Sequence, residues 1–311
     1  MKFLVVMDPI ETVAVAKDTT FGFMLAAQAR GHEVHYCLQD QLYLQGGKAW
    51  AVAWPVTVRA VEGDHFTRGP AVRAPLSDYD SVWMRKDPPV DRAFLHATYI
   101  LDYAGTQVLN HPRGLRDANE KIYSLNFPTV IPETVVTRDA EQVKAILAER
   151  GEKMIAKPVD GHGGRGVFML TPGDRNNNAI LEALTDEGQR WIMLQAYIPE
   201  AREGDKRLLV LDGEPLGAIL RVPQADDNRG NIHVGGSVVA AEVTDRDREI
   251  AAALAPRLKA DGLVFVGLDI IGGLLTEVNV TSPTGIREVK KLCGVDVGDA
   301  YIAWVEQHAK R

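Results

Sequence analysis

The first part of the chain alternates short apolar runs with helical spacings of apolar residues. Apolar runs that stop at turn residues predict buried strands, and apolar positions three or four residues apart predict helices. The predicted strands are residues 2–7, 34–38, 81–84 and 108–109, and the predicted helices are residues 20–30 and 92–103. Strands that alternate with helices are typical of a parallel, Rossmann-like α/β sheet, which we expect to end near residue 118.

The pattern changes after residue 118, where strands come in pairs joined by short turns. Such pairs are expected to run antiparallel, so this part of the chain is predicted to be α+β. The predicted strand segments are residues 153–158, 167–170, 191–197, 207–222 and 262–280, and the predicted helices are residues 140–150, 245–260 and 299–310. Gly151 is the expected C-cap of the first of these helices.

Composition narrows the class of protein without changing this picture. The 311 residues are 46% hydrophobic and 25% charged, an ordinary globular balance with enough length for two or three domains. The formal net charge of −7, with no clustered basic stripe, argues against nucleic acid as a partner. Anionic ligands remain possible, because a few arginines in a cleft bind phosphate whatever the net charge.

Cysteine usage and hydropathy indicate the compartment. Cys37 and Cys293 are far apart and have no metal-ligand spacing, so neither a disulfide framework nor a zinc site is expected. No apolar stretch approaches the roughly 20 residues that span a bilayer, and the apolar run at the start is too short for a signal peptide. These features predict a soluble cytoplasmic protein. No histidine spacing or Gly-x-Ser-x-Gly motif indicates a nucleophilic catalyst.

A glycine-rich segment, GHGGRG at residues 161–166, lies between two predicted strands. Its spacing matches the dinucleotide fingerprint Gly-x-Gly-x-x-Gly, but that motif needs a following helix, and VFMLT predicts a strand. A glycine hairpin can lay backbone N–H groups over phosphates, and Lys157 on the incoming strand can reach phosphate oxygens. The motifs of a P-loop and of a protein kinase are absent. Taken alone, the segment is also compatible with a flexible surface hairpin.

Asp269, Glu277 and Asn279 lie on a predicted hairpin, GLDIIGGLLTEVNV. Glu277 and Asn279 are two residues apart on one strand and therefore share a face. A two-residue turn at residues 272–273 would put Asp269 on the opposite face, whereas a three-residue loop at residues 272–274 would pair it with Glu277. We predict the three-residue loop, because two carboxylates and an amide oxygen would then converge as ligands for Mg²⁺. The alternative is a solvated polar face, but the apolar first strand indicates burial, and a buried carboxylate needs a partner.

Basic and amide side chains lie between these motifs in the sequence. Together they could surround a triphosphate and a carboxylate, because phosphoryl transfer depends on neutralising charge and arginine binds two oxygens at once. Each one alone is also compatible with a solvated surface position. The set is Lys121, Lys157, Lys206, Arg207, Arg221, Arg229 and Asn231. The strand at residues 191–198 can offer its backbone to an adenine ring, or can be a plain core strand.

The order of these features resembles the ATP-grasp superfamily, and finer motifs resemble the bacterial glutathione synthetase family. The motifs are MDPI at 7–10, MRKDPP at 84–89, RDANEK at 116–121, KPVDGHGGRGVF at 157–168, GDKR at 204–207, RGN at 229–231, GLDIIG at 267–272 and TEVNVTSPTGIRE at 276–288. They cover the whole chain in order. The last is the most specific, because it is similar to glutathione synthetases rather than to D-alanine–D-alanine ligases.

The resemblance implies a Rossmann-like N-terminal domain at residues 1–118 and a two-lobed ATP-grasp domain. Its central lobe would cover residues 119–197 and its C-terminal lobe residues 198–311. The implied reaction is the ATP-dependent ligation of γ-glutamylcysteine and glycine through an acyl phosphate, with Mg²⁺ or Mn²⁺ as cofactor. The implied assembly is a homotetramer.

The resemblance also implies a role for each matching residue. The residues expected to bind the ATP phosphates are Lys121, Lys157, Gly161, Gly163, Gly164 and Gly166. The residues expected to bind the rest of the nucleotide are Gln195, Ala196, Tyr197, Ile198 and Asp205. The residues expected to stabilise the acyl phosphate are Arg207 and Arg221, and the expected metal ligands are Asp269, Glu277 and Asn279. The residues expected to bind the peptide substrate, or to lie in its binding loop, are Arg85, Arg229, Asn231, Ser282 and Thr284.

Three other interpretations differ in what they predict. Another ATP-grasp ligase would keep the ATP residues and differ only at the acceptor substrate. A nucleotide-binding protein without ligase activity would have lost a metal ligand or a phosphate lysine, and none is missing here. A Rossmann oxidoreductase would require a helix directly after Gly166.

Overall fold

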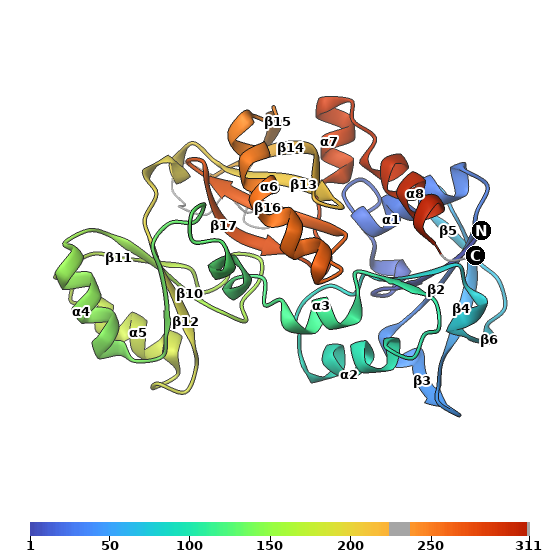
Figure 1. The fold of residues 1–311 in the computed structure, drawn as a ribbon, viewed down its shortest axis with the longest axis horizontal. Helices are drawn as coiled ribbons and strands as arrows, with labels where there is room; N and C mark the ends of the chain where they lie inside the picture. The colour runs from blue at the N-terminus through green and yellow to red at the C-terminus, as the bar shows by residue number, and fades with distance from the viewer. Residues whose placement is uncertain (224–236, 310–311) are drawn as a thin grey trace.

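The computed structural model describes residues 1–223 and 237–309, which form three β-sheets with helices packed on them. Figure 1 shows the N-terminal domain on the right, a small lobe on the left and the C-terminal lobe between them. Met1 and Glu306, one near each end of the described chain, both contact His32. In the described part of the chain, no helix is long and apolar enough to cross a membrane.

The N-terminal sheet has the predicted parallel core. Its strands β1 (Lys2–Val6), β2 (Glu33–Cys37), β7 (Ser81–Met84) and β8 (Gln107–Leu109) pair in parallel in the order β2-β1-β7-β8. Helices α1 (Thr19–Ala29) and α2 (Arg92–Leu101) are close to their predicted bounds. Asp18 and Asp91 cap them, each accepting a hydrogen bond from a first-turn N–H group.

The sequence did not predict an antiparallel extension of this sheet. It consists of β3 (Leu42–Gln45), β4 (Lys48–Val58), β5 (Phe66–Arg68) and β6 (Val72–Pro75). The other three strands all pair with the long strand β4, which itself pairs with β2. The clue was the alternation of buried Ala49, Ala51 and Ala53 with more exposed neighbours, a period of two that small alanines make weak.

The central lobe is an antiparallel sheet covered by two helices. The sheet has the order β11-β10-β12-β9, and the helices pack their apolar side chains on one of its faces. The elements are β9 (Thr134–Thr137), α4 (Ala140–Arg150), β10 (Met154–Pro158), β11 (Phe168–Leu170), α5 (Asn177–Thr185) and β12 (Ile192–Ala196). Gly151 caps α4 with φ of 68°, as predicted, whereas α5 was not predicted.

The C-terminal lobe is a second antiparallel sheet, ordered β15-β14-β13-β16-β17. Its strands are β13 (Asp205–Leu211), β14 (Glu214–Val222), β15 (Ser237–Ala241), β16 (Phe265–Ile271) and β17 (Leu274–Asn279). Its helices are α6 (Asp245–Ala260), at its predicted bounds, α7 (Ile286–Cys293), which was not predicted, and α8 (Val297–His308). Helix α8 returns to the N-terminal domain, where Tyr301 stacks on Phe23 with ring centroids 4.1 Å apart.

Short helical segments connect these parts. The α-helix among them is α3 (Pro112–Asp117), and the 3₁₀ segments are η1 (Ile10–Thr12), η2 (Gln39–Gln41), η3 (Leu76–Asp78), η4 (Ile122–Asn126) and η5 (Pro199–Arg202).

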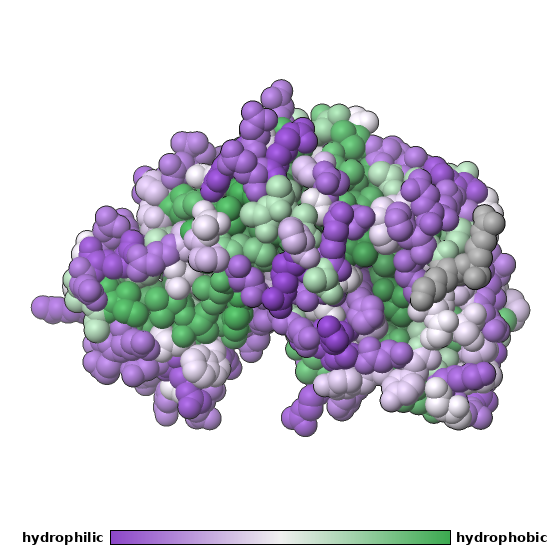
Figure 2. Space-filling view, viewed as in Figure 1, coloured by the Kyte–Doolittle hydropathy of each residue, from purple (hydrophilic) through white to green (hydrophobic). Residues whose placement is uncertain are grey.

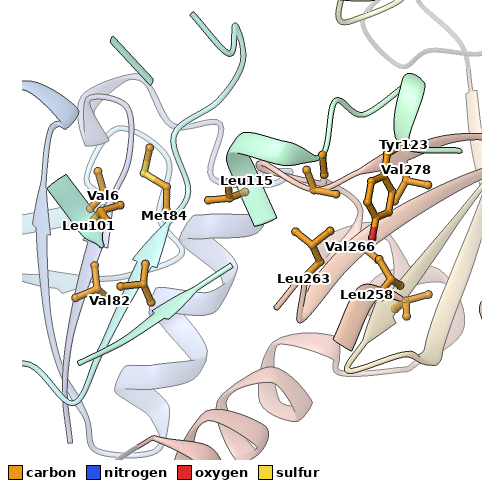
Figure 3. Close-up of a cluster of buried hydrophobic side chains, with 14 of the residues drawn as sticks. Val6, Val82, Met84, Leu101, Leu115, Tyr123, Leu258, Leu263, Val266 and Val278 are labelled. Atoms are coloured by element: carbon orange, nitrogen blue, oxygen red, sulfur yellow. The ribbon is translucent and has the colours of Figure 1, made fainter. Parts of the chain in front are cut away.

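The N-terminal domain and the C-terminal lobe share two hydrophobic cores, one of which lies around Leu115 of α3. Figure 3 shows Val82 and Met84 on one side of this core, Leu263 and Val266 on the other, and Leu115 of α3 between them. Figure 2 shows that the surface is hollowed between the central lobe and the N-terminal domain, with apolar side chains gathered on the side of the central lobe. The central lobe has its own separate apolar cluster, so it is the part of the molecule least tied to the rest by apolar packing.

The contact of α3 with the C-terminal lobe generates a prediction. A Cβ atom at Gly114 would overlap the main-chain oxygen of Asp261, and backbone cannot move aside as a side chain can. We therefore expect Gly114→Ala to lower the free energy of unfolding by about 1–3 kcal/mol, measured as a fall in melting temperature. The control is Gly69→Ala, whose Cβ would meet nothing closer than 3.5 Å. Equal melting temperatures for the two variants would contradict this packing.

Candidate functional site

The acidic hairpin is built differently from the prediction, but it pairs the same residues. Ile271 pairs with Leu274, so the turn is the two-residue Gly272-Gly273 turn and the predicted three-residue loop is wrong. Both glycines have positive φ, 55° and 72°, which suits the tight turns that match strand twist. A register shift between Asp269 and Ile270 then restores the pairing of Asp269 with Glu277.

This shift is a β-bulge that leaves Thr276 unpaired on β17. Ile270 pairs with Leu275 and Asp269 with Glu277, so the residue between them on β17 has no partner across the ladder. Its hydroxyl donates to the main-chain oxygen of Asp269 at 3.1 Å, and its carbonyl accepts from Lys157 Nζ at 3.3 Å. The bulge therefore places both carboxylates on one face and also provides an oxygen for a lysine of the other lobe.

Asp269 lies between two arginines from neighbouring strands. Arg207 donates to both carboxylate oxygens, at 2.5 and 3.2 Å, and Arg221 Nη2 lies 3.0 Å from Oδ1. All three side chains are buried, each residue being 5% exposed. Burial alone would raise the pKa of the Asp269 carboxyl, but the two guanidinium groups hold it well below its usual range.

Asp205 completes this cluster and is left partly unsatisfied. Its Oδ2 accepts from Arg221 Nη2 at 2.5 Å, from the position directly across the strand pair. Burial raises the pKa of Asp205 to about 7, with Arg221 opposing the shift and Asp269 adding to it. Among the described residues, Asp205 Oδ1 and Arg221 Nε are buried without a hydrogen-bond partner. Such groups are costly to leave unpaired, and they suit a site that binds a charged ligand.

Two buried lysines from different parts of the chain meet at this hairpin. Lys121, at the start of the η4 segment, has its Nζ 3.2 Å from Glu277 Oε1 and donates to the main-chain oxygen of Gly161. Lys157, on β10 of the central lobe, reaches the Thr276 carbonyl. Burial lowers the pKa of the Lys157 ammonium, and Glu277 opposes this shift in part. The predicted phosphate lysines and metal carboxylate are therefore neighbours in the structure.

The glycine-rich segment connects β10 to β11, which run antiparallel. The strand that follows it, Phe168–Leu170, confirms the hairpin and excludes the dinucleotide fingerprint, which needs a helix there. Gly163, Gly164 and Gly166 have φ of 63°, 75° and 73°, a region that other residues rarely adopt. The main-chain oxygen of Gly161 holds Lys121, so this loop lies at the edge of the charged cluster.

The predicted adenine strand is β12 and its continuation. The amides of Ala196 and Tyr197 donate to main-chain oxygens of Glu133 and Lys153, at 2.9 and 3.2 Å. Both backbone amides therefore already have hydrogen-bond partners within the central lobe. Gln195 is buried, and its side-chain amide donates to the Thr134 hydroxyl. The adenine role of residues 195–198 stays a prediction.

The predicted substrate residues fall into two groups. Arg229 and Asn231 lie outside the described residues. Ser282 is half-buried and Thr284 exposed, on the segment that follows β17, and Arg85 is buried beneath that segment.

Two polar residues that hold this segment were not predicted from the sequence. They are Asn110, after β8, and Glu120, next to Lys121 in the RDANEK motif. Burial and the nearby Glu277 raise the pKa of the Glu120 carboxyl, while its bonds to Thr281 and Val280 oppose the shift. The sequence signal for Glu120 was an acidic residue next to Lys121, inside a motif already expected to bind phosphate.

The proposed metal ligands offer two carboxylates and one amide as donor groups. Asp269 and Glu277 face each other across the strand pair, and Asn279 is two residues further along. The amide nitrogen of Asn279 donates to the Gly267 carbonyl at 3.2 Å, which leaves its amide oxygen as the remaining ligand atom. Within residues 1–223 and 237–309, no group of three or more His, Cys, Asp or Glu side chains could hold a metal. Two carboxylates and one amide fit an ion that takes its other ligands from phosphate and water, as Mg²⁺ does.

Comparison with known proteins agrees with this geometry. A family model for the prokaryotic glutathione synthetase N-terminal domain matches residues 1–116, and one for the ATP-grasp domain of the same family matches residues 120–294. The glutathione synthetase of Synechococcus elongatus is 48% identical over 98% of both chains, and that of Vibrio parahaemolyticus is 42% identical over 100% of this chain and 99% of its own.

Solved structures with low sequence identity share the fold. The D-cycloserine synthetase DcsG superposes with a TM-score of 0.69 at 17% identity, covering 98% of this chain and 99% of its own. The ATP-grasp ligase PsnB, complexed with a minimal precursor, superposes with a TM-score of 0.64 at 20% identity and covers 98% of both chains.

Two lobes that meet at a cluster of lysines, arginines and paired carboxylates, behind a Rossmann-like domain, define an ATP-grasp enzyme. Its activity is that of an ATP-dependent carboxylate–amine ligase. The chain belongs to the prokaryotic glutathione synthetase family. The predicted fold class and family are thereby confirmed.

The buried carboxylate also generates a prediction about stability. Asp269→Asn leaves two buried guanidinium groups without their shared charge, and removing one partner of a buried ion pair costs about 3–5 kcal/mol. We expect a correspondingly large fall in the melting temperature of the ligand-free protein. Asp64→Asn, which breaks only the exposed contact with Arg59, is the control and should melt like wild type. A ligand-free Asp269→Asn protein as stable as wild type would contradict this account of the site.

Proposed function

We propose that this chain joins γ-glutamylcysteine to glycine through an acyl phosphate, with ATP converted to ADP and phosphate. The cysteinyl carboxylate attacks the γ-phosphorus of ATP, and ADP leaves. The glycine amine then attacks the carbonyl carbon, the C–O bond to phosphate breaks, and the amine loses a proton. The observation that carries this proposal is the buried cluster in which Arg207, Arg221, Lys121 and Lys157 surround the Asp269–Glu277 pair.

The cationic residues have the chemistry this reaction needs. Lys121 and Lys157 are buried beside the glycine-rich loop and would bind ATP phosphates, with the glycines 161, 163, 164 and 166 covering them. Arg207 and Arg221 would stabilise the charge of the acyl phosphate and its transition state, since buried, pre-oriented donors act most strongly on developing charge. Asp269 holds both guanidinium groups in place before substrate arrives.

The carboxylates provide the metal ligands. Asp269, Glu277 and Asn279 would hold Mg²⁺ or Mn²⁺, which when bound neutralises charge on the phosphate oxygens. The unsatisfied Asp205 Oδ1 and Arg221 Nε support a charged ligand at the same place. Residues 195–198 would bind adenine.

The assignment of residues to the peptide substrate depends more on family membership than the assignment of residues to ATP does. Ser282, Thr284, Arg229 and Asn231 would bind the peptide substrate. A different amino-acid or peptide acceptor is the alternative, and an ATP-grasp ligase of the same fold is complexed with a peptide precursor. We further propose a cytoplasmic homotetramer, and the free thiols of Cys37 and Cys293 support a reducing compartment.

The reaction is tested by supplying ATP, Mg²⁺, γ-glutamylcysteine and glycine, and by omitting each in turn. We expect ADP release to require all four components and glutathione to appear in equal amount, measured by coupled assay and mass spectrometry. Release of ADP that needs neither peptide nor glycine would contradict the proposed reaction. Turnover that occurs only with another amine would keep the ligase chemistry and show that glycine is not the amine substrate.

The metal assignment is tested with Glu277→Gln. The amide keeps the shape but loses the charge, so we expect Mg²⁺ affinity to fall by at least about 10–100-fold, the cost of losing even an outer-sphere partner. Turnover should nearly vanish while the melting temperature stays close to wild type. Glu214→Gln, an exposed position in the same lobe, is the matched control. Normal turnover of Glu277→Gln at ordinary Mg²⁺ concentration would show that the metal ligands are elsewhere.

A further inference from the structure

The segment from Val280 to Thr284 is held through its main chain by side chains from outside it. The carbonyl of Val280 accepts from Asn110, and its amide and that of Thr281 donate to Glu120 Oε1 at 2.9 and 3.0 Å. The carbonyl of Thr284 accepts from Arg207 at 3.3 Å. Of the three carbonyls between these points, those of Thr281 and Pro283 accept from Arg85.

Arg85 spans this gap with one guanidinium group. Nη1 donates to the Thr281 carbonyl at 3.4 Å and Nη2 to the Pro283 carbonyl at 3.2 Å. Nε donates to the Thr20 hydroxyl at 3.2 Å, which fixes the group to the N-terminal domain. A planar fork can hold two carbonyls two residues apart in one geometry, whereas an ammonium group presents a single point of attachment.

The position is an unusual one for a cation. Arg85 is 4% exposed, and the rings of Phe23 and Phe265 lie 5.4 and 5.7 Å from its guanidinium carbon. Burial lowers the pKa of this guanidinium. Among the described residues Arg85 forms no ion pair, and Asp18 and Asp87 oppose this shift of its pKa only in part. A buried charge without a direct ion pair is costly, so its two main-chain contacts to one short segment call for a functional explanation.

The side chains of the held segment are left available. The hydroxyls of Ser282 and Thr284 make no hydrogen bond to any described residue, although the backbone on both sides of them is fixed. Arg207 joins the far end of the segment directly to Asp269. A displacement at the Arg85 end would therefore move these two hydroxyls relative to the charged cluster.

We propose that Arg85 is a positioning residue, which fixes the Thr281–Thr284 backbone so that the Ser282 and Thr284 hydroxyls are pre-oriented for the acceptor substrate. It acts through main-chain carbonyls and does not itself bind the peptide, in contrast to the role that the sequence resemblance implies. This inference rests on the proposed function, because the substrate it serves is γ-glutamylcysteine. It adds a reason why the N-terminal domain is needed for a site located on the ATP-grasp lobes.

The first test is Arg85→Met, which keeps the length of the side chain and removes the fork. We expect kcat/KM for γ-glutamylcysteine to fall by about 100-fold, the typical effect of a misplacement of about 1 Å. The affinity for ATP, measured by calorimetry, should stay as in wild type. Arg85→Lys should recover only part of the loss. The control is Arg116→Met, another arginine of the N-terminal domain, which forms an ion pair with Asp102 and makes no hydrogen bond to the segment.

A second readout does not depend on ligase activity. Hydrogen exchange of peptides spanning residues 278–288 should quicken in Arg85→Met, and exchange in the β10–β12 region should not change. If wild type makes no glutathione, the proposed function fails, yet this exchange result still decides whether Arg85 holds the segment. Should Arg85→Met not fold, Arg85→Lys carries the same measurements.

A double-mutant cycle separates positioning from direct binding. If Arg85 acts through the segment, the losses from Arg85→Met and from Ser282→Ala combined with Thr284→Val are strongly non-additive, because each removes the same pre-oriented contacts. Additive losses with unchanged hydrogen exchange would mean that Arg85 contacts the peptide itself, and would overturn the proposal. An equal loss of ATP affinity would overturn it as well, because the effect would then not be confined to the acceptor.

Discussion

The site depends on one buried carboxylate, Asp269, shared by two arginines from neighbouring strands. A buried charge must be compensated, and here compensation requires Arg207 to lie opposite Asp269 and Arg221 to lie opposite Asp205. The register of β13, β14 and β16 is therefore coupled to the electrostatics of the site. The same contacts orient the two guanidinium groups before any substrate is present, so that stability and pre-organisation have one physical origin.

The two lobes and the linker meet at the neighbouring strand. The Thr276 bulge keeps Glu277 across from Asp269 after a two-residue turn, and it supplies the carbonyl that Lys157 of the central lobe reaches. Lys121 reaches Glu277 from the start of η4, in the linker between the N-terminal domain and the central lobe. The apolar core of the central lobe is separate from that of the other parts, so these polar contacts make up much of what connects it to the site.

Local signals were enough to predict most of this arrangement. The parallel core strands, the glycine hairpin, helices α4 and α6 and the pairing of Asp269 with Glu277 follow from periodicity, turn chemistry and metal-ligand preference. The turn length was wrong because a bulge and a longer loop have the same effect on pairing, and only the backbone distinguishes them. The antiparallel extension around β4, the return of α8 to α1, and the roles of Asn110, Glu120 and Arg85 depend on contacts between residues far apart in the chain, which a sequence pattern does not contain.

The central claim is that this site activates a carboxylate as an acyl phosphate. It is tested most directly by supplying γ-glutamylcysteine labelled with ¹⁸O in its cysteinyl carboxylate, together with ATP, Mg²⁺ and glycine, and by measuring the isotope in the phosphate released. The account predicts one labelled oxygen in each phosphate, because the C–O bond of the acyl phosphate breaks when glycine attacks. Glutathione formed with unlabelled phosphate would contradict an acyl-phosphate intermediate.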